Sequence, residues 1–192
     1  MSDGARAELT VHVLRVTLLD VTPPVWRLLR VPSAVTLRAL HDVVQVAMGW
    51  ENRHLHEWRV GERSFGAPDE EDWGEQMEDE SGIVLADVAP ADSVLEYDYD
   101  LGDGWEHLVE VIAVEAYDAT VPPVAVLDGA RAAPPEDSGG PQGYEHLLDA
   151  LAEPTDVEHD EVMAWLGDGF DPERFDPVQI NRRLEPLRRP DV

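Results

Sequence analysis

The chain has 192 residues, and 41 aspartates and glutamates outweigh 14 basic residues, all of them arginine, for a net charge of −27. There is no cysteine, which excludes disulfides, thiolate metal sites and a cysteine nucleophile. With 43% hydrophobic residues, no apolar run of membrane-spanning length and no apolar leader segment, the composition predicts one globular domain, residues 1–192, in the cytoplasm and without a membrane partner.

The first third of the chain predicts two strands and a helix. Alternating apolar residues indicate strands at Leu9–Leu19 and Val25–Val31, and the prolines between them favour an antiparallel pair. Thr36 suits the N-cap of a helix that continues to Met48, and Gly49 suits the left-handed residue that follows a helix.

Strands dominate the middle of the chain and helices its end. Further strands are expected at His54–Val60, Val94–Asp100, Trp105–Val114 and Val124–Leu127, with one helical turn at Val84–Val88. Helices are expected at Tyr144–Leu151, Val157–Leu166 and Pro177–Leu184. This order predicts an α+β fold, in which a mostly antiparallel sheet from the N-terminal two thirds packs against one early helix and a C-terminal helical segment.

The hairpin motif YDYDLGDGWEH, residues 97–107, is rich in polar residues. If Asp103 and Gly104 form a type I′ turn, Asp100 faces His107 and the two side chains lie close together. A carboxylate beside an imidazole orients it, raises its pKa or shares a metal with it. Asp98, Asp103 and Trp105 are candidate binding residues, and the alternative is a salt-bridged hairpin that Trp105 anchors.

His54 and His56 form a second cluster, because alternate residues of a strand project to one face. Two imidazoles at this spacing suit zinc or a similar divalent metal, and Asp100 and His107 are the expected further ligands. The alternative is a pair of surface histidines without a metal.

The loop PPEDSGG, residues 134–140, is the third candidate site. Two glycines before a helix suit a phosphate, but Glu136 and Asp137 repel one unless a cation intervenes. These two acids are therefore candidate binding residues; alternatively, they only favour the start of the helix.

Several segments in the same order resemble the plasmid pRiA open-reading-frame-three-like family, also described as TnpR-like passenger proteins of an insertion element. They are PPVWRLLRVP, TLRALHDVVQVAMGW, NRHLHEW, YDYDLGDGWEH, PPEDSGGPQGYEHLLDAL and FDPERFD. The resemblance spans about residues 23–184 and implies an α+β domain found on mobile elements, without implying an activity. Relatives often carry cysteines where this chain has Val126 and Ala133.

The acidity is concentrated after residue 50. Residues 1–50 hold five arginines and four acids, a net of +1, so the remaining residues carry −28. Eight of the twelve residues from Asp69 to Glu80 are acidic, and we expect a mobile surface loop at about residues 66–82. Direct binding to nucleic acid is not expected, because phosphate contacts need clustered cations.

Four functions are compatible with these observations. The leading hypothesis is a non-enzymatic acidic module that binds a basic protein partner, which a pull-down with the Asp69–Glu80 run neutralised would test. The second is a metal-dependent hydrolase that uses the histidine and aspartate cluster, with Glu136 or Asp137 nearby. Acidity that only favours solubility and mimicry of nucleic acid are the other two. No nucleophile elbow, phosphate-binding loop, dinucleotide-binding fingerprint or HExxH motif occurs.

Overall fold

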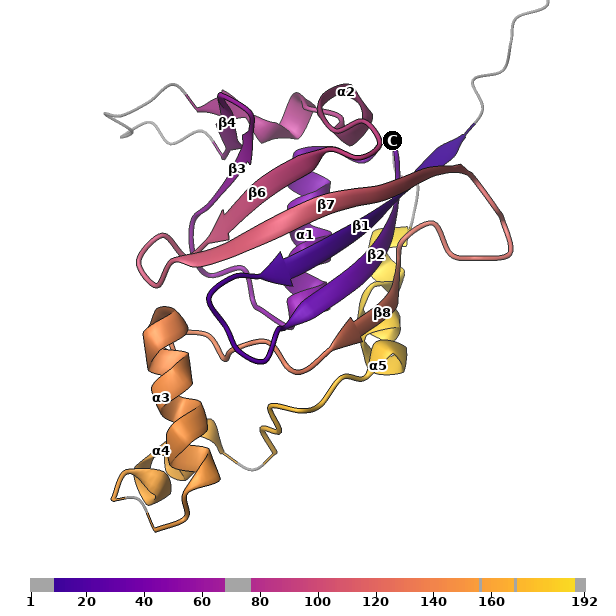
Figure 1. The fold of residues 1–192 in the computed structure, drawn as a ribbon. Coiled ribbons are helices and arrows are strands. Elements are labelled where there is room, and N and C mark those ends of the chain that lie inside the picture. The colour runs from indigo at the N-terminus through magenta and orange to yellow at the C-terminus, as the bar shows by residue number, and fades with distance from the viewer. Residues whose placement is uncertain (1–8, 68–76, 156, 168, 189–192) are drawn as a thin grey trace, which may run out of the picture.

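The computed structural model describes residues 9–67, 77–155, 157–167 and 169–188, which form a sheet with helices against it (Figure 1). The strands are β1 Thr10–Leu18, β2 Trp26–Pro32, β3 His56–Val60, β4 Arg63–Gly66, β5 Glu78–Asp79, β6 Val94–Tyr99, β7 Trp105–Ala116 and β8 Ala125–Ala130. The helices are α1 Leu37–Met48, α2 Leu85–Val88, α3 Gly140–Ala152, α4 His159–Leu166 and α5 Pro177–Arg183, with 3-10 turns η1 Glu80–Gly82 and η2 Glu185–Arg188. No helix in these ranges is long and apolar enough to cross a bilayer.

The eight strands lie in the order β5-β4-β3-β6-β7-β1-β2-β8. Every neighbouring pair is antiparallel except β4 and β5. The predicted α+β class, the mostly antiparallel sheet and the β1–β2 pair are therefore confirmed.

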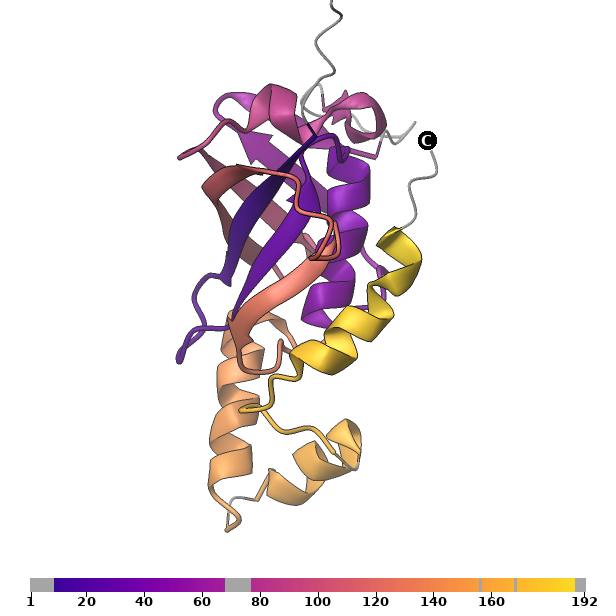
Figure 2. The ribbon, with the colours of Figure 1, turned by 90° about the vertical axis from the view of Figure 1, so that its right-hand side faces the viewer.

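The helix α1 covers one face of the sheet, with α5 beside it (Figure 2). Its apolar residues recur every three or four positions, so Leu37, Leu40, Val44 and Ala47 all turn inward and are at most 1% exposed. The predicted caps of α1 are confirmed: the Thr36 hydroxyl accepts a hydrogen bond from the Ala39 amide, and Gly49 is left-handed with φ 92°. Large aromatic side chains of β3, β6 and β7 complete the core beneath α1, namely Trp58, Tyr97, Tyr99 and Trp105.

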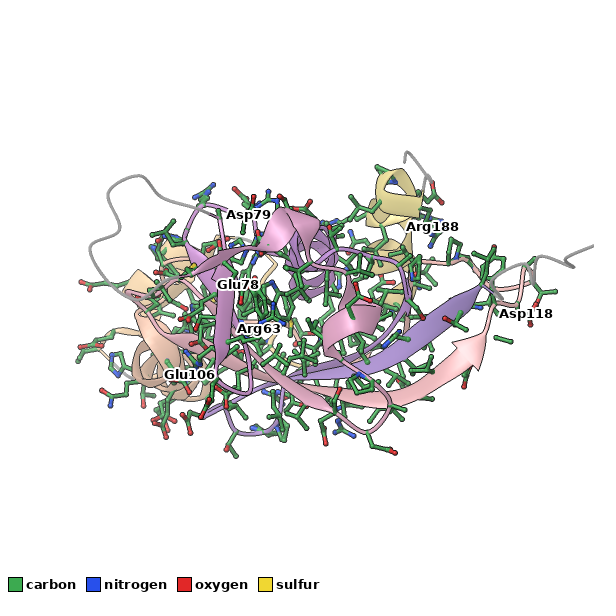
Figure 3. All side chains as sticks on the ribbon, turned by 90° about the horizontal axis from the view of Figure 1, so that it is seen from above. Arg63, Glu78, Asp79, Glu106, Asp118 and Arg188 are labelled. Atoms are coloured by element: carbon green, nitrogen blue, oxygen red, sulfur yellow. The ribbon has the colours of Figure 1, made fainter. Side chains whose placement is uncertain are left out.

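The end of the acidic run is structured, which corrects the expected loop at 66–82. Glu78 and Asp79 form the edge strand β5, and the Arg63 guanidinium donates two hydrogen bonds of 2.8 Å to Glu78 (Figure 3). Glu80 is only 1% exposed. The run lacked the apolar alternation of a strand, so these elements were not predicted, and residues 68–76 lie outside the described ranges.

The β6–β7 hairpin closes through a longer loop than the predicted type I′ turn. Tyr97 pairs with His107 and Tyr99 with Trp105, so the expected pairing of Asp100 with His107 is wrong. Asp100 leaves the strand with φ 53°, and its carboxylate Oδ1 accepts hydrogen bonds from the amides of Gly102 and Asp103. This local hydrogen bonding ends the ladder at Tyr99 and turns Asp100 away from His107.

The helices α3 and α4 lie beyond the end of the sheet where this hairpin turns (Figures 1 and 2). Asp103 joins the hairpin to α3, because its Oδ2 accepts a hydrogen bond of 3.0 Å from the Gly139 amide. The Asp103 carbonyl also lies so close to Gly140 that a side chain there would overlap it. The phosphate suggested for the start of this helix would therefore compete with a carboxylate of the protein itself.

Candidate functional site

Three carboxylates surround the ring of His54 at this end of the sheet. Its Nε2 atom lies 3.1 Å from Asp137 Oδ1, 3.5 Å from Asp100 Oδ2 and 3.7 Å from Glu136 Oε2. The atom is shielded from solvent, yet none of these contacts has hydrogen-bond geometry. His54, Asp100 and Asp137 each offer one donor atom within 4.8 Å of the others, which is a separation that ligands of one metal ion can have.

The pairing of β3 with β6 brings His54 and Asp100 together. His56 pairs with Tyr99, and the Asp100 amide donates a hydrogen bond of 2.9 Å to the Leu55 carbonyl. His54, two residues before β3, and Asp100, the residue after β6, therefore lie at the same end of an antiparallel pair.

The loop that carries Glu136 and Asp137 is held against this end by α1. The indole N–H of Trp50, just after α1, donates a hydrogen bond of 2.8 Å to the Pro134 carbonyl. The Ser138 hydroxyl donates one to the Pro135 carbonyl and closes the turn around the two acids. Residues 85 positions apart in the chain thus meet, as the bond from the Glu51 amide to Glu136 Oε1 confirms.

Hydrogen-bond donors orient two of the carboxylates so that one oxygen of each faces His54. Glu136 Oε1 accepts hydrogen bonds from the Glu51 amide and the Tyr99 hydroxyl, while Oε2, which the same hydroxyl also reaches at 3.2 Å, is the atom nearest His54. Asp100 Oδ1 accepts the two loop amides, while Oδ2 faces His54. Burial raises the pKa of the Tyr99 hydroxyl, so this group remains a neutral donor to Glu136.

Asp100 and Asp137 both adopt left-handed backbone conformations, with φ 53° and 57°. Such conformations cost a non-glycine residue about 1 kcal/mol, although aspartate and asparagine tolerate them best. The two loop amides hold Asp100 in this conformation, and substitution of either residue by asparagine removes the charge while it retains the backbone preference.

His56, a predicted metal ligand, lies in a different cluster. It is the first residue of β3 and 7% exposed, its ring stacks on His41 at 3.5 Å, and its Nε2 lies 2.9 Å from Glu80 Oε2. His41 is held in turn by the Tyr97 hydroxyl and the Asn52 side chain, and burial lowers its pKa to about 3. His56 therefore belongs to a buried polar network and not to the His54 group.

His107, the other predicted ligand, is fully buried in the core. Its Nδ1 donates a hydrogen bond of 3.0 Å to the Tyr97 carbonyl, and its Nε2 has no hydrogen-bond partner among the described residues. Trp50 packs edge-on against the ring. Burial lowers the pKa of His107 to about 4, which keeps it neutral at pH 7.

The remaining candidates serve the fold around the site. Asp98 alternates with the inward-facing tyrosines of β6, so it lies on the other face of the sheet, where it pairs with Arg59 at 2.6 Å. Trp105 is 1% exposed and packs edge-on against Tyr144 of α3, which fixes the hairpin to that helix. Asp103 makes the bond to Gly139 described above.

Sequence reasoning missed the residues that orient this cluster. Tyr99 was assigned only to a strand, Trp50 occurred only at the end of a family-like segment, and Glu51 was not singled out. A tryptophan directly after a helix C-cap and a proline pair before two acids were the available signals, but nothing local indicated that these segments meet.

Comparison with known proteins identifies the family. The model of the plasmid pRiA4b ORF-3-like protein family matches residues 10–179, so the chain belongs to this family and the resemblance in the sequence is confirmed. The chain is 38% identical over 177 residues to the uncharacterised protein y4hQ of Sinorhizobium fredii, which covers 91% of this chain and 90% of that protein. The crystal structure of MM3350, a protein of unknown function from Methanosarcina mazei Go1, is similar with a TM-score of 0.83 at 34% identity, covering 90% of this chain and 98% of that one.

Proposed function

We propose that the protein binds one divalent metal ion through His54, Asp100 and Asp137, and that it is a metal-dependent hydrolase. The observation that supports this is the His54 Nε2 atom, buried without a hydrogen bond among three carboxylate oxygens at 3.1–3.7 Å. Ligands about 2.0–2.1 Å from a tetrahedral zinc lie roughly 3.3 Å apart, so these separations suit donors that share one ion.

Glu136 is the candidate general base in this proposal. It lies slightly farther from His54 than the two aspartates, and the Tyr99 hydroxyl and Glu51 amide hold its carboxylate with Oε2 toward the cluster. A bound metal would supply a water molecule of lowered pKa, and a carboxylate beside it accepts a proton. His54 and the two aspartates then act as ligands and Glu136 as the proton acceptor.

The donor set favours zinc or manganese. One imidazole nitrogen with two or three carboxylate oxygens is a borderline-to-hard environment, and the carboxylates outweigh the charge of a divalent ion. Without a metal, the same carboxylates repel one another across the His54 ring, and a cation removes this repulsion.

Metal titration tests the proposal. Protein dialysed against EDTA should bind one equivalent of Zn²⁺ or Mn²⁺ in calorimetry, and His54→Gln, Asp100→Asn and Asp137→Asn should each weaken binding by about 100-fold. His146→Gln is the matched control, because His146 is exposed and contacts Glu158 outside the cluster. Equal affinities in all four variants would refute the site.

Glu136→Gln separates the metal site from the hydrolase. With Zn²⁺ bound, this variant should retain one equivalent of metal and lose about 100-fold of any esterase or phosphatase turnover detected with nitrophenyl substrates. If turnover is unchanged, Glu136 is not the base, whatever the metal affinity.

Binding of a basic protein partner stays a prediction from the sequence. Most of the acidic run behind it, residues 68–76, lies outside the described ranges, while Glu78 and Glu80 are already paired with Arg63 and His56.

A further inference from the structure

A pocket adjoins the proposed metal cluster, because Glu136 both contacts His54 and lines this pocket. A pocket of about 270 Å³ opens between the end of α1, the loop of residues 132–136 and the segment from Gly169 to Arg183. Its walls are mostly apolar, with Met48, Trp50, Pro134, Phe170, Phe175 and Ile180 among them. Concave sites with apolar walls and a few charged groups are typical of small-molecule binding.

Arg27 of β2 lines this pocket although its side chain is buried. The residue is 2% exposed, its Nε donates to the Ala47 carbonyl and its Nη1 donates to the carbonyls of Trp26 and Ala130. No carboxylate of the described residues pairs with it, and its guanidinium lies 5.2 Å from the centre of the Phe175 ring. Burial without a counter-ion lowers the pKa of Arg27 to about 10.

Two further arginines stand at the rim. Arg183, in the last turn of α5, forms no ion pair within the described ranges, and Arg174 is 3.8 Å from Asp176. Arg27 and Arg183 therefore line one pocket without a carboxylate partner among the described residues.

The acids that line the same pocket are already engaged. Asp176 Oδ1 accepts a hydrogen bond from the Gln179 amide and caps α5, and Asp171 Oδ1 accepts one from the Glu173 amide. Glu136 is bound to the Tyr99 hydroxyl. Their charges remain and these donors set their orientation, although Asp176 Oδ2 also lies 3.8 Å from Arg174.

We propose that this pocket binds a small organic monocarboxylate with an apolar body, whose carboxylate pairs with Arg183 and Arg174 in the field of Arg27. A planar guanidinium matches a carboxylate with two parallel hydrogen bonds. The apolar walls select the body of the ligand, and the nearby Asp171, Asp176 and Glu136 disfavour a dianion such as a phosphate monoester. This inference does not depend on the metal site.

Benzoate is a suitable probe, with acetate, benzyl alcohol and phenyl phosphate for comparison. The EDTA-treated full chain is titrated and the indole N–H signal of Trp50, which lines the pocket, is followed by NMR. Benzoate should bind with a Kd of about 1–10 mM, as expected for a fragment of this size. Acetate, benzyl alcohol and phenyl phosphate should each bind about tenfold more weakly, because each lacks the apolar body or the single negative charge.

Arg183→Met and Arg182→Met form a matched pair. Both residues are in the last turn of α5, but Arg182 lines a different surface near Val126. Arg183→Met should weaken benzoate binding about fivefold and Arg182→Met less than about twofold. Equal effects in the two variants, no binding of benzoate, or equal binding of benzyl alcohol or phenyl phosphate would overturn the proposal. Because no metal is present, none of these outcomes bears on the metal site.

Discussion

Replacing His107 by glutamine should flatten the pH dependence of stability. In the folded chain the pKa of His107 is about 4, because the ring is fully buried, whereas an unfolded histidine titrates near 6.5. Between these values the unfolded chain binds a proton that the folded chain does not, so stability falls as the pH falls. From pH 7 to pH 5 the loss attributable to His107 is about 2 kcal/mol. Glutamine has no such proton and retains a donor for the Tyr97 carbonyl.

The assay is urea unfolding at several pH values between 7 and 5, followed by tryptophan fluorescence and circular dichroism. The glutamine variant is expected to be less stable at pH 7 than the wild type, so the change of stability with pH is the quantity to compare. His146→Gln is the control, because His146 is exposed, and it should leave the pH dependence unaltered. Parallel curves for the wild type and His107→Gln would show that the buried ring does not resist protonation and would refute the reasoning.

Two further predictions concern packing and a buried carboxylate. Gly140→Ala should cost about 2–4 kcal/mol in urea unfolding, because the added methyl overlaps the Asp103 carbonyl of the hairpin loop and φ is 70°. Gly104→Ala has φ 71° but open space around the methyl, so it should cost only about 1 kcal/mol. Glu80→Gln should cost about 1–3 kcal/mol, because it weakens the buried contact with His56. Glu96→Gln removes only an exposed ion pair with Arg59, so it should cost less than about 1 kcal/mol. Equal losses within either pair would contradict the corresponding argument.

Local rules predicted the elements whose signals lie within a few residues. The caps of α1 need only Thr36 and Gly49, and the β1–β2 pair needs only two alternating runs and a short connection. The strands β4 and β5 were not predicted. β4 has only four residues, and β5 consists of two acidic residues. Phe65 pairs with Glu78 and Gly66 with Asp79, and the Arg63–Glu78 contact beside them is one that no periodicity encodes.

Sequence patterns predicted only part of the candidate site. Strand alternation places His54 and His56 on one face if both lie in the strand, but β3 begins at His56. Alternation also does not say which face is the core, and both His56 and His107 proved to be inside it. His54 and Asp137 meet through contacts between distant segments, such as the bonds from Trp50 to the Pro134 carbonyl and from Glu51 to Glu136, more than 80 residues apart.

Glu136 connects the two proposed sites, because it contacts His54 and also lines the arginine pocket. A metal ion beside Glu136 offsets its negative charge, and the repulsion between that charge and a bound carboxylate then falls. Zn²⁺ should therefore tighten benzoate binding about three- to fivefold, and benzoate should tighten Zn²⁺ binding by the same factor. In Glu136→Gln the repulsion is already absent, so benzoate should bind more tightly to the metal-free protein and the effect of Zn²⁺ should shrink. Calorimetric titration of each ligand with and without the other measures this coupling, and an unchanged benzoate affinity in metal-free Glu136→Gln would show that Glu136 does not connect the sites.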